Sequence, residues 1–255
     1  MQTSDRTTLL RDLKNYLTFL RSYGYTDIPL ESKSPLSAGS RNTDETHPLN
    51  ESTQLQSDMA KQTPAKKSTV PTLENIRSEL GDCARCKLSS GRKTIVFGSG
   101  NPRADLVFVG EGPGKDEDEQ GFPFVGRAGK KLTEIIENGM NLHREQDTYI
   151  CNIVKCRPPG NRDPKEEEIS ACKPFLVKQL QAIRPLAIVA LGKPAASTLL
   201  GRNVPITKER GTWHEFEGIP LMLTFHPAYL LRFYTLENRR AVMDDMNKVL
   251  KKLKG

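Results

Sequence analysis

The stretch Asp105-Leu-Val-Phe-Val-Gly-Glu-Gly-Pro-Gly114 decides the fold of this chain. Its apolar first half predicts a buried strand, and the glycines and proline that follow predict a stiff turn that brings backbone N–H groups close to a ligand. A phosphate-binding P-loop needs Gly-x-x-x-x-Gly-Lys-Ser/Thr, but here the glycines lie too close together and Asp116 follows the lysine. The stretch therefore indicates a strand that leads into a ligand-binding loop of another kind.

Apolar runs alternate with helical patterns on both sides of this stretch. The alternation predicts a parallel sheet covered by helices on both faces, with functional loops at the carboxyl ends of the strands. The Gly110 loop, Asn152 and His226 all fall at or just past such ends. The expected strands are 94–97, 105–109, 148–154, 186–191 and 220–224, and the expected helices are 72–81, 129–140, 165–183, 193–200 and 238–253.

The sequence divides into three regions. Residues 8–22 carry leucines and a tyrosine at three- and four-residue intervals, which predicts a short amphipathic helix within an N-terminal region of residues 1–30. Residues 31–70 are rich in Ser, Thr, Gln, Asn, Pro and charge, so we expect a disordered linker there. The globular domain is expected over residues 71–255.

The composition favours a basic, cytoplasmic protein. The 255 residues carry a net charge of +7, with a pI of about 9.1, which suits an anionic partner such as nucleic acid. No apolar run is long enough to span a membrane, and charged residues interrupt the leucine-rich N-terminus, which argues against a secretory signal. In the cytoplasm, the five cysteines are better explained as metal ligands or free thiols than as disulfides.

Four of the cysteines form a local pair and a distant pair. Cys83 and Cys86 make a C-x-x-C loop, in which two thiolates converge on a turn and can bind one side of a metal centre. Cys156 and Cys172 are widely spaced, which fits an iron–sulfur cluster, whereas structural zinc, the alternative, usually takes a second tight pair. Cys151 lies within an expected strand and is interpreted as a plain buried thiol.

The segment after the glycine-rich loop combines an acidic run with aromatic residues. Residues 116–119 are all acidic, and such a run is ordinarily a solvated face, although one of its members could supply a catalytic carboxylate. Phe124 follows within Gly121-Phe-Pro-Phe-Val-Gly126. It is either a core residue or a ring that stacks on a planar base.

A series of ordered motifs carries a family resemblance: Gly110-Glu-Gly-Pro-Gly, Glu117-Asp118, Gly121-x-Pro-Phe-Val-Gly-x-Ala-Gly129, Asn152-Ile-Val-Lys-Cys-Arg-Pro-Pro159, Leu191-Gly192 and His226-Pro-Ala-Tyr-Leu-Leu-Arg232. They resemble the family 4 uracil-DNA glycosylases, the iron–sulfur type, over about residues 72–255. The resemblance implies a three-layer α/β/α sandwich with a mostly parallel sheet, and hydrolysis of the N-glycosidic bond of deoxyuridine in DNA, which initiates base excision repair. It also implies a [4Fe-4S] cluster on Cys83, Cys86, Cys156 and Cys172.

The resemblance further implies roles for individual residues. His226 would donate a hydrogen bond to uracil O2 and so stabilise the leaving uracil anion. Asn152 would read the uracil edge by donating to O4 and accepting from N3–H, and Phe124 would provide the stacking platform. Backbone groups of Glu111, Gly112 and Pro113 would line the pocket.

The motifs leave open which carboxylate orients the attacking water. Better-known uracil-DNA glycosylases carry an aspartate in this loop, where this chain has Gly112. Glu111 or Glu117 could replace it, and we favour Glu117, although substrate binding alone could suffice. A second family with the same cluster lacks a glutamate at position 111, so Glu111 argues for family 4.

DNA contacts are expected around the pocket, because a target base must leave the duplex stack before it can react. Side chains that could fill the vacated space are Tyr229, Leu230 and Leu231. Side chains that could hold phosphates are Lys155, Arg157, Arg162, Arg210 and Arg232.

Two other functions stay open on the sequence: a nucleic-acid-binding module without catalysis, and a hydrolase of small nucleotides. A binding module would not need Asn152, Phe124 and His226 together, and the basic charge favours a polymer substrate. We expect a monofunctional enzyme, because no motif places a lysine for Schiff-base attack. It should act on uracil-containing DNA as a monomer away from membranes, and the helix at 8–22 could bind a protein partner.

Overall fold

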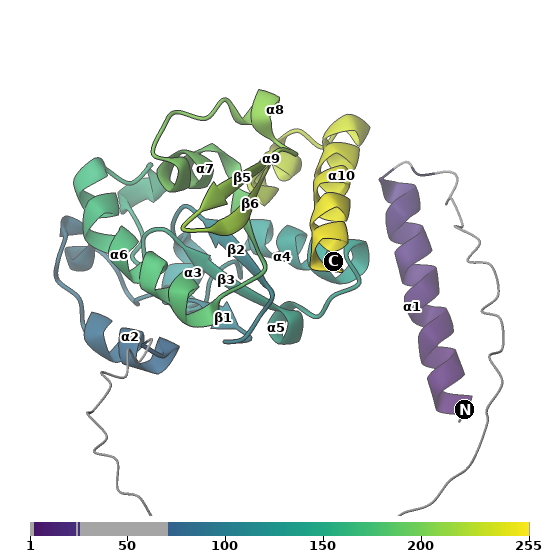
Figure 1. Cartoon of the computed structure of the whole chain (residues 1–255), viewed down its shortest axis with the longest axis horizontal. Helices are drawn as coiled ribbons and strands as arrows, with labels where there is room; N and C mark the ends of the chain where they lie inside the picture. Colours follow the sequence, from purple (N-terminus) through teal and green to yellow (C-terminus); the bar gives the residue numbers. More distant parts are fainter. Residues whose placement is uncertain (1–2, 24, 26–70, 255) are drawn as a thin grey trace, which may run out of the picture. The chain divides into compact units, whose positions relative to one another are not determined.

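The computed structural model describes residues 3–23, 25 and 71–254, so the linker expected at 31–70 lies outside the described residues. The strands are β1 (Ser99–Gly100), β2 (Leu106–Gly110), β3 (Thr148–Asn152), β4 (Ala187–Leu191), β5 (Trp213–Phe216) and β6 (Ile219–Thr224). They form one sheet in the order β1-β3-β2-β4-β6-β5 (Figure 1). The four central strands run parallel, and the edge strands β1 and β5 are antiparallel to their neighbours.

Helices occupy most of the chain between the strands. None of those in the described residues is long and apolar enough to cross a membrane. The α-helices are α1 (Thr3–Ser22), α2 (Leu73–Leu80), α3 (Lys115–Gln120), α4 (Arg127–Glu134), α5 (Arg144–Asp147), α6 (Glu166–Ile183), α7 (Gly192–Leu200), α8 (Ile206–Glu209), α9 (Pro227–Arg232) and α10 (Leu236–Leu253). Shorter turns of other helix types are η1 (Lys87–Ser90), η2 (Ile135–Gly139) and η3 (Pro159–Asn161).

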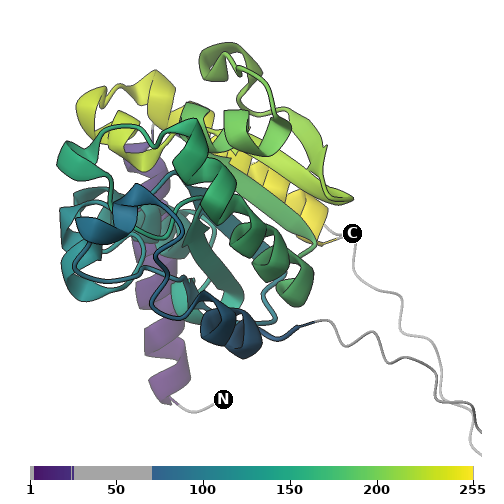
Figure 2. The ribbon, with the colours of Figure 1, turned by 90° about the vertical axis from the view of Figure 1, so that its left-hand side faces the viewer.

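Buried strands send alternate side chains to the two faces of the sheet. In β2, Val107 and Val109 join the core beneath α6 and α7, whereas Leu106 and Phe108 join the core beneath α4, η2, α9 and α10. Figures 1 and 2 show the sheet between these two sets of helices. The expected three-layer α/β/α sandwich with a mostly parallel sheet is confirmed.

The four parallel strands end at one edge of the sheet. Gly110, Asn152, Leu191 and Thr224 are their last residues, and each leads directly into a loop or a helix. Because parallel strands end on the same side, segments from distant parts of the sequence meet there. Figure 2 shows the loops and short helices gathered at this edge.

The strand expected at 94–97 is wrong. The N–H groups of Lys93 and Thr94 instead donate to the Asp118 carboxylate, at 2.9 and 3.3 Å, so side-chain bonds replace a strand ladder. Asp118 is buried within α3, so at least this member of the acidic run does not belong to a solvated face. The two edges of the sheet are formed by β1 and β5. Most residues of these two strands are partly or fully exposed, and neither strand has an apolar pattern that would predict it.

The end of α1 shares a small core with the domain that was expected to begin at residue 71. Phe19, Leu20 and Tyr23 pack with Met243 of α10, and the Phe19 and Tyr23 rings stack at 4.3 Å between centroids. Tyr25 Oη donates to Asp244 at 2.7 Å. Leucines in the predicted amphipathic stripe nearer the N-terminus, Leu10, Leu13 and Leu17, are exposed. The amphipathic helix thus buries its C-terminal end on the domain.

Tyr23 gives a test of this contact. Its side chain is fully buried, yet its hydroxyl has no hydrogen-bond partner. Tyr23→Ala should therefore lower the thermal unfolding midpoint by roughly 6–12 °C, from about 3 kcal/mol of lost packing. Tyr23→Phe, the matched control, removes only the unpartnered hydroxyl and should leave the midpoint unchanged or raise it. Equal midpoints for all three proteins in a calorimetric scan would contradict the contact.

Candidate active site

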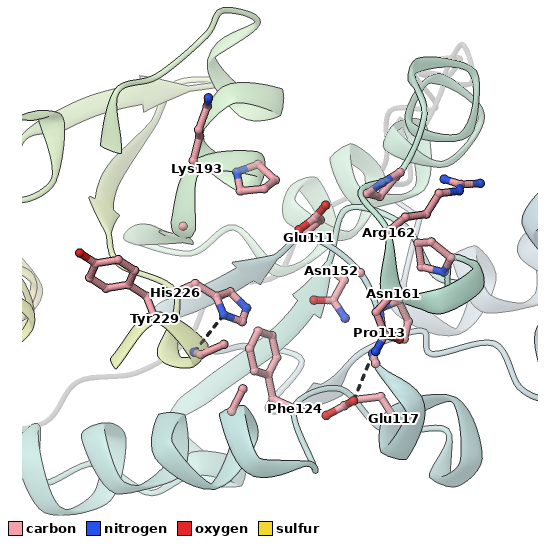
Figure 3. A pocket seen from close by; sticks show the side chains of 18 of the residues that line it. Glu111, Pro113, Glu117, Phe124, Asn152, Asn161, Arg162, Lys193, His226 and Tyr229 are labelled. Carbon is pink, nitrogen blue, oxygen red and sulfur yellow. Dashed lines mark hydrogen bonds between the residues drawn. The ribbon is translucent and has the colours of Figure 1, made fainter. Parts of the chain in front are cut away.

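A cavity of about 600 Å³ opens at the carboxyl edge of the parallel strands. Its walls come from the loop after β2, the end of β3, the start of α7 and the start of α9. Figure 3 shows Phe124, Asn152 and His226 directed toward the same space, with Glu111 beside them. The structure brings together every predicted pocket residue: Glu111, Gly112, Pro113, Glu117, Phe124, Asn152 and His226.

Asn152 presents an unused acceptor to this cavity. It ends β3 in register with Gly110 of β2, and a side chain on Gly110 would collide with the Asn152 amide oxygen. The residue is 1% exposed, and its Oδ1 has no hydrogen-bond partner. A buried acceptor without a partner costs free energy, so the site favours a ligand that donates a hydrogen bond to it.

The Phe124 ring forms a flat wall of the cavity. Its backbone has a φ of 54°, in the left-handed region, which costs a residue other than glycine about 1–3 kcal/mol. Packing maintains this conformation, because Gly129 in the first turn of α4 lies directly against the Phe124 carbonyl, where a side chain would collide. The ring centroids of Phe124 and His226 are 5.6 Å apart. A planar ligand can therefore lie on Phe124 with its edge at His226.

His226 precedes α9 and is held as a neutral donor. Its Nδ1 accepts a hydrogen bond from the Ala228 N–H at 3.1 Å, shown as a dashed line in Figure 3. In a neutral ring the proton must then lie on Nε2. Burial lowers the pKa of His226 to about 4, so the ring is neutral at physiological pH. The side chain can donate one hydrogen bond from Nε2 without carrying a charge.

The Glu117 carboxylate fastens two loops of the cavity together. Oε2 accepts the Gly114 N–H at 3.1 Å, and Oε1 accepts those of Val125 and Gly126 at 2.9 and 2.8 Å. The bond to Gly114 is dashed in Figure 3. These contacts tie the glycine-rich loop to the segment that carries Phe124. Both carboxylate oxygens are thus engaged by backbone donors.

Glu111 has a different environment from Glu117. Its Oε1 is buried and has no hydrogen-bond partner. It also lines a second cavity, of about 660 Å³, together with Asp163. Burial, the charge of Asp163 and a side-chain hydrogen bond with Asp163 raise the pKa of Glu111 to about 7. Near neutral pH this carboxyl can therefore gain or lose a proton.

Two polar residues that line the cavity were missed in the sequence, Asn161 and Lys193. Asn161 lies in the left-handed region at a φ of 56°, and its side chain accepts a hydrogen bond from Arg157 at 2.7 Å. The pair Gly160-Asn161 does signal a turn, but nothing in the sequence places that turn beside the cavity. Lys193 stands in the first turn of α7 and carries no motif of its own.

Expectations about the wedge residues are partly wrong. Leu230 is fully buried in the core beneath α9, so it cannot enter a base stack. Tyr229 stacks on Phe225 and contacts the tilted ring of Phe233, with ring centroids 4.5 and 4.9 Å away. Phe233 and Tyr234, directly after α9, are the large side chains exposed there. The helical turn that buries Leu230 was not apparent from the motif.

Two of the expected phosphate contacts are also wrong. Lys155 is 1% exposed and cannot reach a phosphate. Arg210 is held by Asp245, whose Oδ2 accepts its Nε–H at 3.0 Å. Arg162 also pairs with a carboxylate, that of Glu168, but it lines the cavity, as does Arg232.

The predicted thiolate centre draws on the loop after α2 (Cys83 and Cys86), the segment after β3 (Cys156) and α6 (Cys172). The pKa of Cys156 is raised to about 11, mainly by burial; Arg92 lowers it, and the nearby thiols of Cys172 and Cys86 add to the rise, so these thiols lie close together. Cys83 acts on Cys172 in the same way. Within the described ranges, no three His, Cys, Asp or Glu side chains are arranged to hold a single metal ion. Thiolates of an iron–sulfur cluster bind different irons and need not converge on one point.

Hydrogen-bond donors, two of them arginine side chains, contact three of these sulfurs, as a negatively charged metal–thiolate group would require. Arg85 donates to Cys83 Sγ at 3.3 Å, Arg92 donates to Cys156 Sγ at 3.5 Å, and the Lys155 N–H donates to Cys172 Sγ at 3.3 Å. Such donors stabilise thiolates relative to thiols. The residues therefore fit a metal–thiolate group. Cys151 is fully buried on β3, as expected for a plain thiol.

The fold and the cavity define an α/β/α protein with a pocket that fits a planar, hydrogen-bonding ligand. Comparison with known proteins identifies its group. A family model described as the uracil DNA glycosylase superfamily matches residues 97–251.

Individual relatives narrow the assignment. A type-4 uracil-DNA glycosylase from Thermotoga maritima is 48% identical over 179 residues, which is 69% of this chain and 92% of the relative. One from Saccharolobus solfataricus is 44% identical, over 71% of this chain and 86% of the relative. A type-5 enzyme from Pyrobaculum aerophilum is 30% identical, over 51% of this chain and 57% of the relative. The chain belongs to the uracil-DNA glycosylase superfamily, in its type-4 group.

Proposed function

We propose that this protein is a monofunctional uracil-DNA glycosylase that hydrolyses the N-glycosidic bond of deoxyuridine in DNA, the first step of base excision repair. The observation that carries the proposal is one cavity in which an unpartnered amide oxygen, a flat ring and a neutral imidazole donor face the same space. Uracil offers a matching N3–H, a planar ring and an O2 acceptor.

Base recognition follows from the fixed donors and acceptors. Asn152 Oδ1 accepts from uracil N3–H, and its amide nitrogen donates to O4. Cytosine has an unprotonated N3 and an amino group at C4, so it would leave buried groups unpaired. Phe124 supports the ring face. Thymine has the same hydrogen-bonding edge as uracil, so its exclusion depends on space around C5.

Bond cleavage places negative charge on the base and positive charge on the sugar. The bond between C1′ and N1 breaks, the electron pair stays on uracil, and a hydrogen bond from His226 Nε2–H to O2 stabilises that anion. Water adds its oxygen to C1′ and loses a proton, and the uracil anion takes up one proton. The products are neutral uracil and an abasic site in the DNA.

We propose Glu111, rather than the initially favoured Glu117, as the carboxylate that orients the water. Both oxygens of Glu117 already accept backbone hydrogen bonds, so Glu117 acts as a positioning residue. Glu111 lines the cavity with one oxygen unpartnered. Gly112, where better-known enzymes of the superfamily carry an aspartate, has no side chain to compete with it.

The thiolates of Cys83, Cys86, Cys156 and Cys172 would hold a [4Fe-4S] cluster. When bound, the cluster would cross-link the loop at 83–86 to the segment after β3 and to α6. Hydrolysis transfers no electrons, so we assign the cluster a structural role. DNA is the proposed partner, and the chain is expected to act as a cytoplasmic monomer.

The direct test uses the purified full-length chain and an oligonucleotide with a single uracil. Alkali-labile cleavage at that position, but not in a matched oligonucleotide with cytosine or thymine, is the expected result. Binding without cleavage would instead favour the alternative of a nucleic-acid-binding module.

His226→Ala should lower the single-turnover rate about a hundredfold or more, because the lost hydrogen bond acts on charge that develops in the transition state. DNA affinity should change little. Because the pKa of His226 is about 4, its protonation should cause no change in the excision rate at pH values well above 4. A parallel loss of affinity and rate would make His226 a structural residue.

The excision rate should rise with pH around a midpoint near 7, where Glu111 loses its proton and can accept one from water. Glu111→Gln should remove this rise and slow excision by about a hundredfold or more. Asp163→Asn should move the midpoint to lower pH, because it removes a charge that raises the pKa of Glu111. A wild-type pH profile in Glu111→Gln would exclude Glu111 as the base.

The purified protein should be brown and contain about four irons per chain, as a cluster on four thiolates requires. Cys172→Ser should lose the colour. Cys151→Ser, the matched control, changes a buried thiol outside the proposed ligand set and should keep it. Stoichiometric zinc without iron would contradict the cluster.

A further inference from the structure

Lys155 is a buried lysine between the thiolate centre and the base pocket. Its side chain is among the largest that are almost completely buried in the described residues, and lysine is rarely buried to this degree. The thiols of Cys151 and Cys172 lie close enough to act on its charge. Neither the proposed reaction nor the DNA contacts explain why a lysine stands here.

The hydrogen bonds of Lys155 reach both sites. Its Nζ donates to the main-chain carbonyl of Asn152 at 2.7 Å, which closes a turn at the end of β3. Its main-chain N–H donates to Cys172 Sγ at 3.3 Å. Its carbonyl accepts the Val96 N–H at 2.8 Å, which fixes the backbone from the third side. One residue therefore contacts a proposed metal ligand and the backbone of the residue that reads the base.

These contacts leave little freedom for independent movement. Cys172 lies in α6, and its sulfur accepts the Lys155 N–H. A displacement of this sulfur would therefore act on the backbone at Lys155. The Lys155 side chain then acts on the Asn152 carbonyl, and the Asn152 amide lies at the cavity. Lys155 and its two hydrogen bonds thus connect the Cys172 sulfur to the main chain of Asn152.

We infer that Lys155 is a positioning residue that couples the thiolate centre to the base pocket, so that metal at the four cysteines and uracil at Asn152 stabilise each other. The inference rests on the proposed function. Coupling between two binding sites is reciprocal: if bound metal favours uracil binding, bound uracil must slow the loss of metal by the same free energy.

The test measures metal release from the full-length protein to an excess of chelator, whichever metal the purified protein contains. Saturating free uracil should slow release several-fold in the wild type, and cytosine, which does not match Asn152, should not. Lys155→Met keeps the length and the backbone N–H but removes the bond to Asn152. It should abolish the protection by uracil and reduce single-turnover excision about tenfold, the cost of leaving a buried carbonyl unpaired.

Lys178→Met is the matched control, because Lys178 lies on the same helix as Cys172 but pairs with Glu79 at the surface. It should keep both the protection and the excision rate. Protection that persists in Lys155→Met, or metal release equal with uracil and cytosine in a wild type that excises uracil, would overturn the inference. The comparison of uracil with cytosine in the wild type tests the coupling even where Lys155→Met fails to fold. A wild type that excises no uracil would refute the proposed function itself.

Discussion

The register between β2 and β3 is the constraint on which the rest of the site depends. It sets Gly110 beside Asn152 at the carboxyl edge, where any larger residue would collide with the Asn152 amide and with the Phe124 ring. Because Gly110 has no side chain, the Asn152 amide and the Phe124 ring can both pack against its backbone. Phe124 in turn has a left-handed backbone, and the lack of a side chain on Gly129 lets α4 approach its carbonyl. The cavity is therefore built around two glycines, each of which other groups approach too closely for a side chain to fit.

Three carboxylates in the short segment after β2 differ in role because they differ in partners. Asp118 and Glu117 accept backbone N–H groups and hold loops in place. Glu111 keeps an oxygen free, and burial beside Asp163 keeps its proton within reach of neutral pH. The oxygens of Glu117 and Asp118 that accept these bonds are engaged, whereas an oxygen of Glu111 remains free to accept a bond from a ligand or a water.

The sequence predicts the layers of this fold well, because the central strands are continuous apolar runs and parallel strands must be covered on both faces. It fails at 94–97 and at Trp213–Phe216, where long-range bonds or edge pairing decide the structure. The motifs identify Asn152 and His226 as pocket residues. They do not reveal the burial of Leu230 and Lys155, since neither the turn of a short helix nor the inward direction of a lysine is encoded locally.

The segment from Asn152 to Cys156 carries more of the chemistry than any other of its length. It supplies the amide that we propose reads the base, the lysine that binds the main-chain carbonyl of the same residue, and one proposed metal ligand. Strand β3 and the Cys172 contact fix its two ends, so an insertion within it would shift the amide relative to the thiols. A metal centre at the four cysteines would thus support activity without taking part in the reaction, because it would fix the backbone from which the pocket is built.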